Sequence, residues 1–219
     1  MDNNVRKIKT YSRNLGKGLT DLAKSLLTSE LPNYLIDWQK LAHTKNLHVE
    51  IGFGDGLNLY HTAANNPENH FLGIEVYANG VCNLLKLCTA NPLKNLFIHW
   101  GDADLILDSI ANNSVGTFCI FFPDPWPKIK HRKRRLLNYT RLTLLNQKLQ
   151  PHGTIKFITD IENYFAQVLC LLPDDNCKIF SQLNLGDWYN GYIITKYHEK
   201  ALIAQRKVQA LMYYKKNQP

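Results

Sequence analysis

Strand-length and helix-length segments alternate regularly along this chain from residue 47 onward. The expected strands are short apolar runs at Leu47–Ile51, Phe71–Glu75, Leu96–Trp100, Val115–Phe122 and Thr154–Thr159. Stretches with helical patterning follow them near residues 57–65, 77–90, 103–111, 134–149 and 161–172. Such alternation predicts a mostly parallel sheet with helices on both faces, and ligands that bind at the carboxyl ends of the strands.

The last part of the chain breaks this alternation. Residues 177–183, 193–197 and 209–214 are strand-like and predict a late hairpin that adds an antiparallel strand. The whole pattern therefore predicts an α/β domain whose sheet has about seven strands.

Length and charge predict one domain with a basic extension. The 219 residues suffice for a single α/β domain with a full core. Basic residues are dense near the amino terminus, so we expect residues 1–28 to form a flexible basic arm on a domain that spans 29–219. A net charge of +8 favours a polyanionic partner.

Other compositional features point to a cytoplasmic protein. No apolar stretch approaches the ~20 residues of a membrane span, and residues 1–7 lack the apolar core of a signal peptide. The five cysteines have no Cys-x-x-Cys spacing, which argues against a zinc site or a disulfide framework. We therefore expect no membrane contact and no metal, while a monomer and a homodimer both remain open.

Acidic residues stand at the ends of three successive expected strands. The first strand runs into Glu50-Ile-Gly-Phe-Gly-Asp-Gly56, whose alternate glycines let a backbone approach a ligand closely. This spacing differs from the Gly-x-Gly-x-x-Gly of dinucleotide-binding proteins. Glu75 ends the second strand and Asp102 follows the third, where a ribose and an adenine would lie. S-adenosylmethionine combines a ribose, an adenine amine and a positive charge, and it fits these three acids.

The segment Phe121-Phe-Pro-Asp-Pro-Trp-Pro-Lys128 predicts a stiff loop at the end of the fourth strand, because three prolines prevent a helix. The loop carries a carboxylate, an aromatic face and an ammonium. Five of the six residues at 130–135 are Lys or Arg. An acidic and aromatic pocket beside a cationic strip suits a nucleic acid base. The alternative is a proline-rich turn followed by a solvated helix face.

Taken in order, these motifs resemble those of the bacterial tRNA (guanine-N7)-methyltransferases, a family with a Rossmann-like class I fold that uses S-adenosylmethionine. The shared segments are Glu50–Gly56, Gly73–Val76, Gly101–Ala103, Phe121–Lys128, His131–Arg135, Thr159–Asp160 and Thr195–Tyr197. The match spans about residues 9–214, and the Phe-Phe-Pro-Asp-Pro-Trp block is specific to that family. The resemblance implies methyl transfer from S-adenosylmethionine to N7 of a guanine in the variable loop of tRNA.

The resemblance also implies roles for individual residues. Donor binding falls to Glu50, Gly52, Gly54, Glu75, Asp102, Ala103 and Asp124. Asp124 is also the expected catalytic residue, between the donor and the base. Substrate binding falls to Lys128, Asp160, Thr195, Lys196, Tyr197 and His198. Contacts with the RNA backbone fall to Arg13, Lys17, Lys130, His131, Arg132, Lys133, Arg134 and Arg135.

Two positions have open roles. His198 stands where the family pattern has Glu, so either a register shift or a changed base contact is implied. Trp126 either stacks on the base or packs the loop.

The expected chemistry requires little of the protein. Guanine N7 carries a lone pair and no proton, so no general base is needed. An ionised Asp124 can accept hydrogen bonds from the N1 and N2 edge of guanine and stabilise the positive charge that develops on the ring.

Three other functions are less consistent with the sequence. The glycine spacing opposes a nicotinamide-dependent oxidoreductase. A non-catalytic RNA-binding protein with a vestigial pocket would not need every acidic position filled. An amino-group methyltransferase would show Asn/Asp-Pro-Pro-Tyr/Phe in place of Pro-Asp-Pro-Trp.

Overall fold

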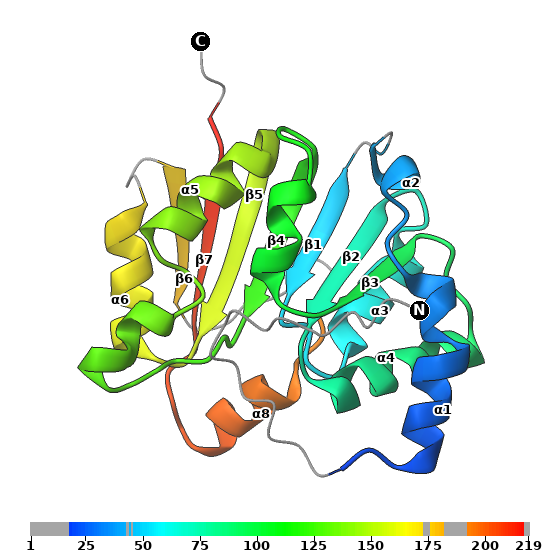
Figure 1. Ribbon diagram of the computed structural model, residues 1–219. Coiled ribbons are helices and arrows are strands. Elements are labelled where there is room, and N and C mark those ends of the chain that lie inside the picture. Colours follow the sequence, from blue (N-terminus) through cyan, green and yellow to red (C-terminus); the bar gives the residue numbers. More distant parts are fainter. Residues whose placement is uncertain (1–17, 43, 45, 173–175, 182–191, 217–219) are drawn as a thin grey trace.

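A seven-stranded sheet with the order β3-β2-β1-β4-β5-β7-β6 forms the centre of the protein (Figure 1). The computed structural model describes residues 18–42, 44, 46–172, 176–181 and 192–216. The strands are β1 (Leu47–Ile51), β2 (His70–Glu75), β3 (Leu96–Trp100), β4 (Val115–Phe121), β5 (Leu149–Thr159), β6 (Cys177–Ser181) and β7 (Gln209–Tyr214). Strands β1 to β5 run parallel to one another, and β7 is antiparallel to both β5 and β6. The predicted α/β fold of about seven strands with a late hairpin is confirmed.

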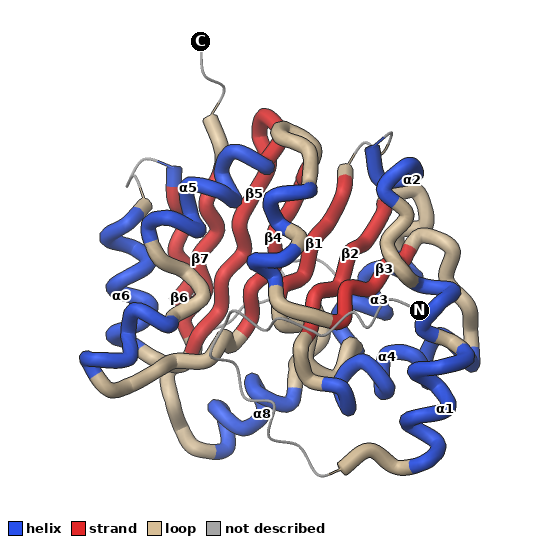
Figure 2. The backbone as a smooth tube through the Cα atoms, viewed as in Figure 1, coloured by secondary structure: helices blue, strands red, loops and turns tan. Residues whose placement is uncertain are grey.

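Helices cover both faces of this sheet (Figure 2). The α-helices are α1 (Asp21–Ser29), α2 (Trp38–Ala42), α3 (Leu57–Asn65), α4 (Ala78–Ala90), α5 (Tyr139–Lys148), α6 (Glu162–Leu171) and α8 (Lys196–Ile203). Four 3₁₀ turns are η1 (Leu31–Tyr34), η2 (Ala103–Leu105), η3 (Leu107–Ser109) and η4 (Ile129–Arg134).

Each strand sends alternate side chains to opposite faces, and this creates two main cores. In β2, Phe71 packs with residues of α1, α3 and α4. Its neighbours Leu72 and Ile74 pack instead with residues of α2, α5 and α6. A strand buried on both faces needs apolar residues at nearly every position, which is why the parallel strands are continuous apolar runs. The strand ends, rather than the faces, are therefore left for polar ligands.

The predicted amino-terminal arm differs from the structure in its second half. Residues 21–28 lie in α1, whose Ala23 and Leu26 are buried, and the Cys82 thiol of α4 lies 3.5 Å from the Ala23 carbonyl oxygen. This part of the expected arm is a packed helix, because its apolar residues find a partner surface on α4. Arg13 and Lys17 lie outside the described residues.

Two other local expectations were wrong. Residues 103–111 form the turns η2 and η3 rather than one helix, because the backbone leaves helical geometry at Ile106, where φ is −128°. Residues 193–197 do not form a strand. Thr195 instead caps α8, accepting a hydrogen bond from the His198 amide at 3.3 Å.

None of the helices in the described part of the chain is long and apolar enough to cross a membrane. Among the same residues, no three His, Cys, Asp or Glu side chains are grouped in a way that could hold a metal ion.

Gly80 lets α4 approach the loop that follows β1. A Cβ atom at this position would lie 2.0 Å from the Gly54 carbonyl oxygen, which is backbone and cannot move independently. We predict that Gly80→Ala lowers the free energy of unfolding by about 1–3 kcal/mol, the usual range for overpacking. This loss should appear although alanine is the better helix former by about 1 kcal/mol. Urea unfolding measures it.

Gly18→Ala is the matched control, because nothing lies within 4 Å of the added Cβ there. Equal stability of Gly80→Ala and wild type would show that α4 does not press on the Gly54 loop.

Candidate active site

The carboxyl ends of β1 to β4 lie at one edge of the sheet, and the loops after them carry the predicted donor-binding residues. The loop after β1 turns through Gly52, Gly54 and Gly56, whose φ values of 78°, 60° and 77° are left-handed. Only glycine adopts this conformation freely. The loop is thereby pressed into a tight turn that ends at the first residue of α3.

Glu75, the last residue of β2, fastens this glycine loop. Its carboxylate accepts hydrogen bonds from the backbone amides of Gly54 at 2.9 Å, Val76 at 2.7 Å and Tyr77 at 2.8 Å. Burial is the main cause that raises the pKa of Glu75, and the three amide bonds oppose it. The side chain is therefore a buried, oriented acceptor between two strand ends.

Glu50 in β1 is buried beside the same loop. Its carboxyl oxygen accepts a hydrogen bond from the Asn58 side-chain amide at 2.9 Å. Burial raises the pKa of Glu50 to about 8, and the negative charges of Asp55 and Glu75 raise it further. The Asn58 oxygen also accepts a bond from the Ile193 amide at 3.2 Å, which ties the start of the α8 segment to the β1 edge.

Asp102, which follows β3, is less accessible to a ligand than its predicted role in donor binding would require. Its side chain is fully buried and accepts a hydrogen bond from the Asp104 amide at 2.9 Å, which caps η2. Ala103 beside it is also buried. In this conformation Asp102 shapes the loop from inside.

Asp124 lies in the loop after β4, between two residues with left-handed backbones. Phe122 has φ 48° and Trp126 has φ 41°, a conformation that costs energy for bulky residues and clusters at functional sites. Asp124 is exposed. Its charge raises the pKa values of both Glu75 and Tyr197, so it lies near the end of β2 and near α8.

The α8 segment closes this arrangement. The exposed Tyr197 has its pKa raised by burial of part of its ring and by the charges of Asp124, Glu75 and Asp55. Lys196 forms an ion pair with Asp55 at 3.2 Å. A cluster of acidic groups around one aromatic ring is a suitable environment for a positively charged ligand, and the residues present thus fit S-adenosylmethionine.

Two predicted substrate contacts occupy other positions. His198 is fully buried, with its Nδ1 3.1 Å from the Tyr192 hydroxyl and its ring 5.5 Å from that of Phe122. It packs beneath the β4 loop, and burial lowers its pKa. Asp160, after β5, forms an ion pair with Arg206 at 2.7 Å.

The cationic residues at 128–134 differ in their exposure to solvent. Lys128, Lys130 and Lys133 are exposed, and His131, Arg132 and Arg134 are partly buried. Trp126 packs the loop, since the Arg134 guanidinium lies 5.1 Å from its ring centre and the His131 ring meets it edge-on at 5.9 Å.

Arg135 is not a surface residue, and its buried position does not fit the predicted contact with the RNA backbone. The side chain is fully buried because it is the hydrogen-bonding partner of α6 and of the β4 loop.

Sequence reasoning missed several residues of the site. Asn58, Asp55 and Tyr77 each stand one or two positions after a predicted motif residue, and Arg206 pairs with the predicted Asp160. Asp55 lies inside the glycine motif and could have been found from it. Nothing local in the sequence points to Arg206.

A parallel sheet with this strand order, a glycine loop after β1 and buried acids at the first two strand ends define a Rossmann-like class I methyltransferase. A family model described as "Putative methyltransferase" (Methyltransf_4) matches residues 44–211. The chain belongs to this family of S-adenosylmethionine-dependent methyltransferases.

Two relatives agree with this assignment. A tRNA (guanine-N(7)-)-methyltransferase of Wolbachia pipientis is 39% identical over 165 residues, covering 75% of this chain and 73% of the relative. A bifunctional methyltransferase of Rickettsia felis is 42% identical over 200 residues, covering 90% of this chain but 38% of the relative. This chain thus spans less than half the length of that bifunctional protein.

Solved structures share the fold at low sequence identity. A 16S rRNA methyltransferase superposes with a TM-score of 0.58 at 13% identity, covering 84% of this chain and 95% of the other. An antibiotic-related methyltransferase gives 0.53 at 17% identity, covering 92% and 96%.

The buried Glu50 gives the protein a pH-dependent stability. The folded state keeps the Glu50 proton up to about pH 8, whereas the unfolded chain releases it near its ordinary pKa of 4.5. Wild-type stability should therefore fall as pH rises between these values. Glu50→Gln keeps an acceptor for Asn58 and has no proton to lose. We predict that its stability rises relative to wild type by up to about 1 kcal/mol per pH unit across this window.

Urea unfolding at pH 5, 6.5 and 8 measures this difference, and Glu68→Gln controls for the loss of an exposed carboxyl group. A constant difference between Glu50→Gln and wild type at all three pH values would contradict the prediction.

Proposed function

We propose that this protein transfers a methyl group from S-adenosylmethionine to N7 of a guanine in the variable loop of tRNA. The observation that carries the proposal is the position of Asp124. It is an exposed carboxylate on a stiff loop. It lies near the buried acids at the carboxyl ends of β1 and β2, which we call the donor edge, and shortly before the exposed Lys128, Lys130 and Lys133. The name of the Wolbachia relative supports the same substrate.

The donor supplies an electrophilic methyl group on a positively charged sulfur. Asp124, Glu75 and Asp55 give the donor edge a negative potential that favours such a cation, and Glu50, which keeps its proton up to about pH 8, would become charged when the cation binds beside it. Gly52 and Gly54 let the backbone approach it closely, and Ala103 and Asp102 shape the wall after β3. These residues would hold the donor at this edge beside the β4 loop, and orientation of donor and base would supply most of the rate enhancement.

Asp124 is the proposed catalytic residue. Its carboxylate would accept hydrogen bonds from the N1 and N2 edge of guanine and stabilise the positive charge that the ring gains on methylation. No side chain has to remove a proton, because N7 carries none. Tyr197 and Lys196 at the start of α8 are exposed, and with Thr195 before them they are proposed to contact the base.

The remaining cations are proposed to bind tRNA phosphates. Lys130 and Lys133 are exposed on η4, and Lys128 is exposed just before it. On α8, the Lys200 ammonium lies 5.5 Å from the centre of the Tyr197 ring. Exposed lysines can neutralise RNA phosphates and release the counterions bound to them. His131, Arg132 and Arg134, which are partly buried, would contact the backbone at its closest approach.

The proposed product can be mapped directly. Purified protein is incubated with labelled donor and an unmodified tRNA transcript, and borohydride-aniline cleavage then locates any 7-methylguanosine. We predict one cleavage site in the variable loop. A transcript made with 7-deazaguanine has no N7 atom and should accept no label. Label in that control, or methylation of an exocyclic amine, would refute the N7 assignment.

Replacing the Asp124 carboxylate tests its role. We predict that Asp124→Asn lowers turnover by about 10²-fold, the usual effect of losing a group that stabilises developing charge. Donor affinity, measured by calorimetry, should change much less, because Glu50 and Glu75 remain. Glu68→Gln, at the opposite edge of the sheet, controls for the loss of one charge. Lost donor binding with turnover preserved at saturation would make Asp124 a donor ligand only.

A further inference from the structure

Arg135 is the most extensively bonded buried cation near the site. Its Nε donates to the Pro125 carbonyl at 2.8 Å, and its Nη1 donates to the Asn163 carbonyl at 3.1 Å and to the Gln167 side chain at 2.7 Å. Its Nη2 donates to the Asn163 side-chain oxygen. The guanidinium carbon lies 4.5 Å from the centre of the Tyr164 ring.

All of these acceptors are neutral oxygens. A buried charge carries a large desolvation cost unless its hydrogen bonds are satisfied, and a bonded guanidinium is held in one orientation by its planar fork. Arg135 is therefore well suited to join two segments rigidly. The two segments that it joins are α6, through Asn163 and Gln167, and the β4 loop, through Pro125.

The bonded carbonyl belongs to the residue immediately after Asp124. The same short loop contains Phe122 and Trp126 in left-handed conformations, which relax unless their surroundings hold them. On the strand side, the Phe122 amide donates to the Ile158 carbonyl at 2.8 Å. On the other side, the Arg135 bond to Pro125 holds the loop. Hydrogen bonds at Phe122 and at Pro125 therefore hold the loop on both sides of Asp124.

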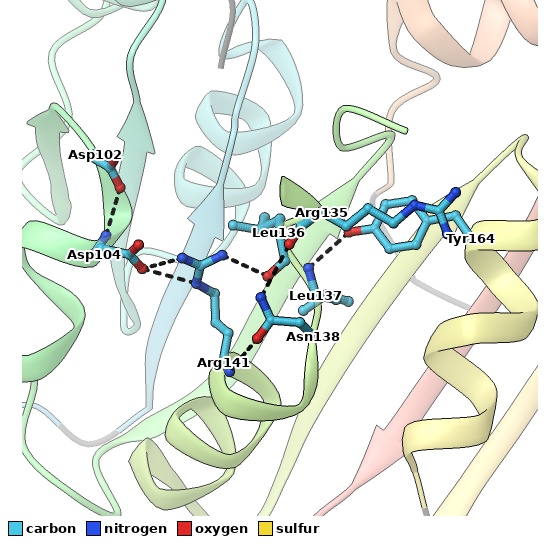
Figure 3. Close-up of polar contacts among 8 residues, drawn as sticks. All are labelled: Asp102, Asp104, Arg135, Leu136, Leu137, Asn138, Arg141 and Tyr164. Carbon is cyan, nitrogen blue, oxygen red and sulfur yellow. Dashed lines mark hydrogen bonds and ion pairs between the residues drawn. The ribbon is translucent and has the colours of Figure 1, made fainter. Parts of the chain in front are cut away.

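The same segment continues to the donor edge, as Figure 3 shows. Asn138 donates to the Arg135 carbonyl at 3.4 Å and accepts from the Arg141 amide at 3.0 Å. The Arg141 guanidinium bonds the Leu136 carbonyl at 2.7 Å and forms an ion pair with Asp104, whose amide donates to Asp102. One hydrogen-bonded chain therefore links the loop after β3 with the segment that begins at Arg135.

We propose that Arg135 is a positioning residue for methyl transfer: by bonding the Pro125 carbonyl to α6, it holds the Asp124 carboxylate where the base must meet the donor. The inference rests on the proposed role of Asp124. It gives Arg135 a different task from its neighbours in the basic run, since Arg135 acts through Asp124 and does not touch RNA.

The test is a double-mutant cycle between Arg135→Lys and Asp124→Asn. Lysine keeps the charge but loses the fork that bonds both segments. Arg135→Lys alone should lower kcat by about 10- to 100-fold, the effect of misplacing a reacting group by about 1 Å. Both KM values should change by less than about threefold. In the Asp124→Asn background the same substitution should lower kcat by about twofold at most, because the group that it positions is already gone.

Two further measurements separate positioning from damage to the fold. The fraction of donor-binding protein, titrated with S-adenosylhomocysteine, should stay the same in Arg135→Lys. Hydrogen exchange of residues 122–135 should become faster. Gln167→Met removes one acceptor and keeps Arg135, so it should lower kcat in the same direction by up to about fivefold. This variant carries the cycle with Asp124→Asn if Arg135→Lys does not fold.

Lys133→Ala is the matched surface variant from the same basic run. It should raise the KM for tRNA and reduce the salt dependence of binding by about one unit of slope. Arg135→Lys should do neither.

The inference is overturned if the kcat of folded Arg135→Lys is within about twofold of that of wild type. It is also overturned if the effects of Arg135→Lys and Asp124→Asn on kcat multiply in the double variant. It is also overturned if Arg135→Lys behaves like Lys133→Ala, which would make Arg135 an RNA contact. Failure of the N7 mapping refutes the proposed function only. The cycle is then run on the methylation that wild type performs, because it reports on Asp124 whatever atom is methylated.

Discussion

The three backbone amides that bond the Glu75 carboxylate hold the functional edge of this protein together. Strands β1 and β2 end side by side, and the Gly52 amide donates to the Ile74 carbonyl at 2.8 Å. By accepting from Gly54, Val76 and Tyr77, one buried side chain fixes the glycine loop against the end of β2. The close contact between Gly80 and the Gly54 carbonyl then follows, because α4 begins just after the residues that Glu75 bonds.

A second buried charge has the corresponding task on the base side. Arg135 offers donors where Glu75 offers acceptors, and each converges on backbone from two separate segments. The Arg141–Asp104 ion pair and the capped turn η2 join the segment that begins at Arg135 to the loop after β3. The reacting groups are therefore carried by loops, whereas their positions are set by side chains buried in the sheet and helix layers.

Much of the fold could be predicted from the sequence, because it depends on local patterns. Continuous apolar runs predicted the parallel strands, and the glycines and acids after them predicted the strand ends at which the candidate site lies. The strand expected at 193–197 was wrong because Ile193 and Ile194 suggested β-structure, while the capping contact of Thr195 with the His198 amide favours a helix.

The roles of Arg135 and His198 could not be read locally. Five of the six residues at 130–135 are Lys or Arg, and the local sequence does not indicate that Arg135 is the buried one. That depends on Asn163 and Gln167, which come from another helix. His198 is buried because Phe122 and Tyr192 close over it, a contact between separate loops.

Asn58 joins the two parts of the candidate site, the end of β1 and the segment before α8. Its side chain donates to Glu50 at the donor edge and accepts from Ile193 at the approach to α8. A cation bound near Glu50 favours the charged carboxylate, which is the stronger acceptor for Asn58. If the proposed donor binds there, it would hold the Asn58 amide more firmly, and with it the bond from Ile193. Thermodynamic linkage would make this relation reciprocal: a base that settles against α8 would change the affinity for the donor by the same factor.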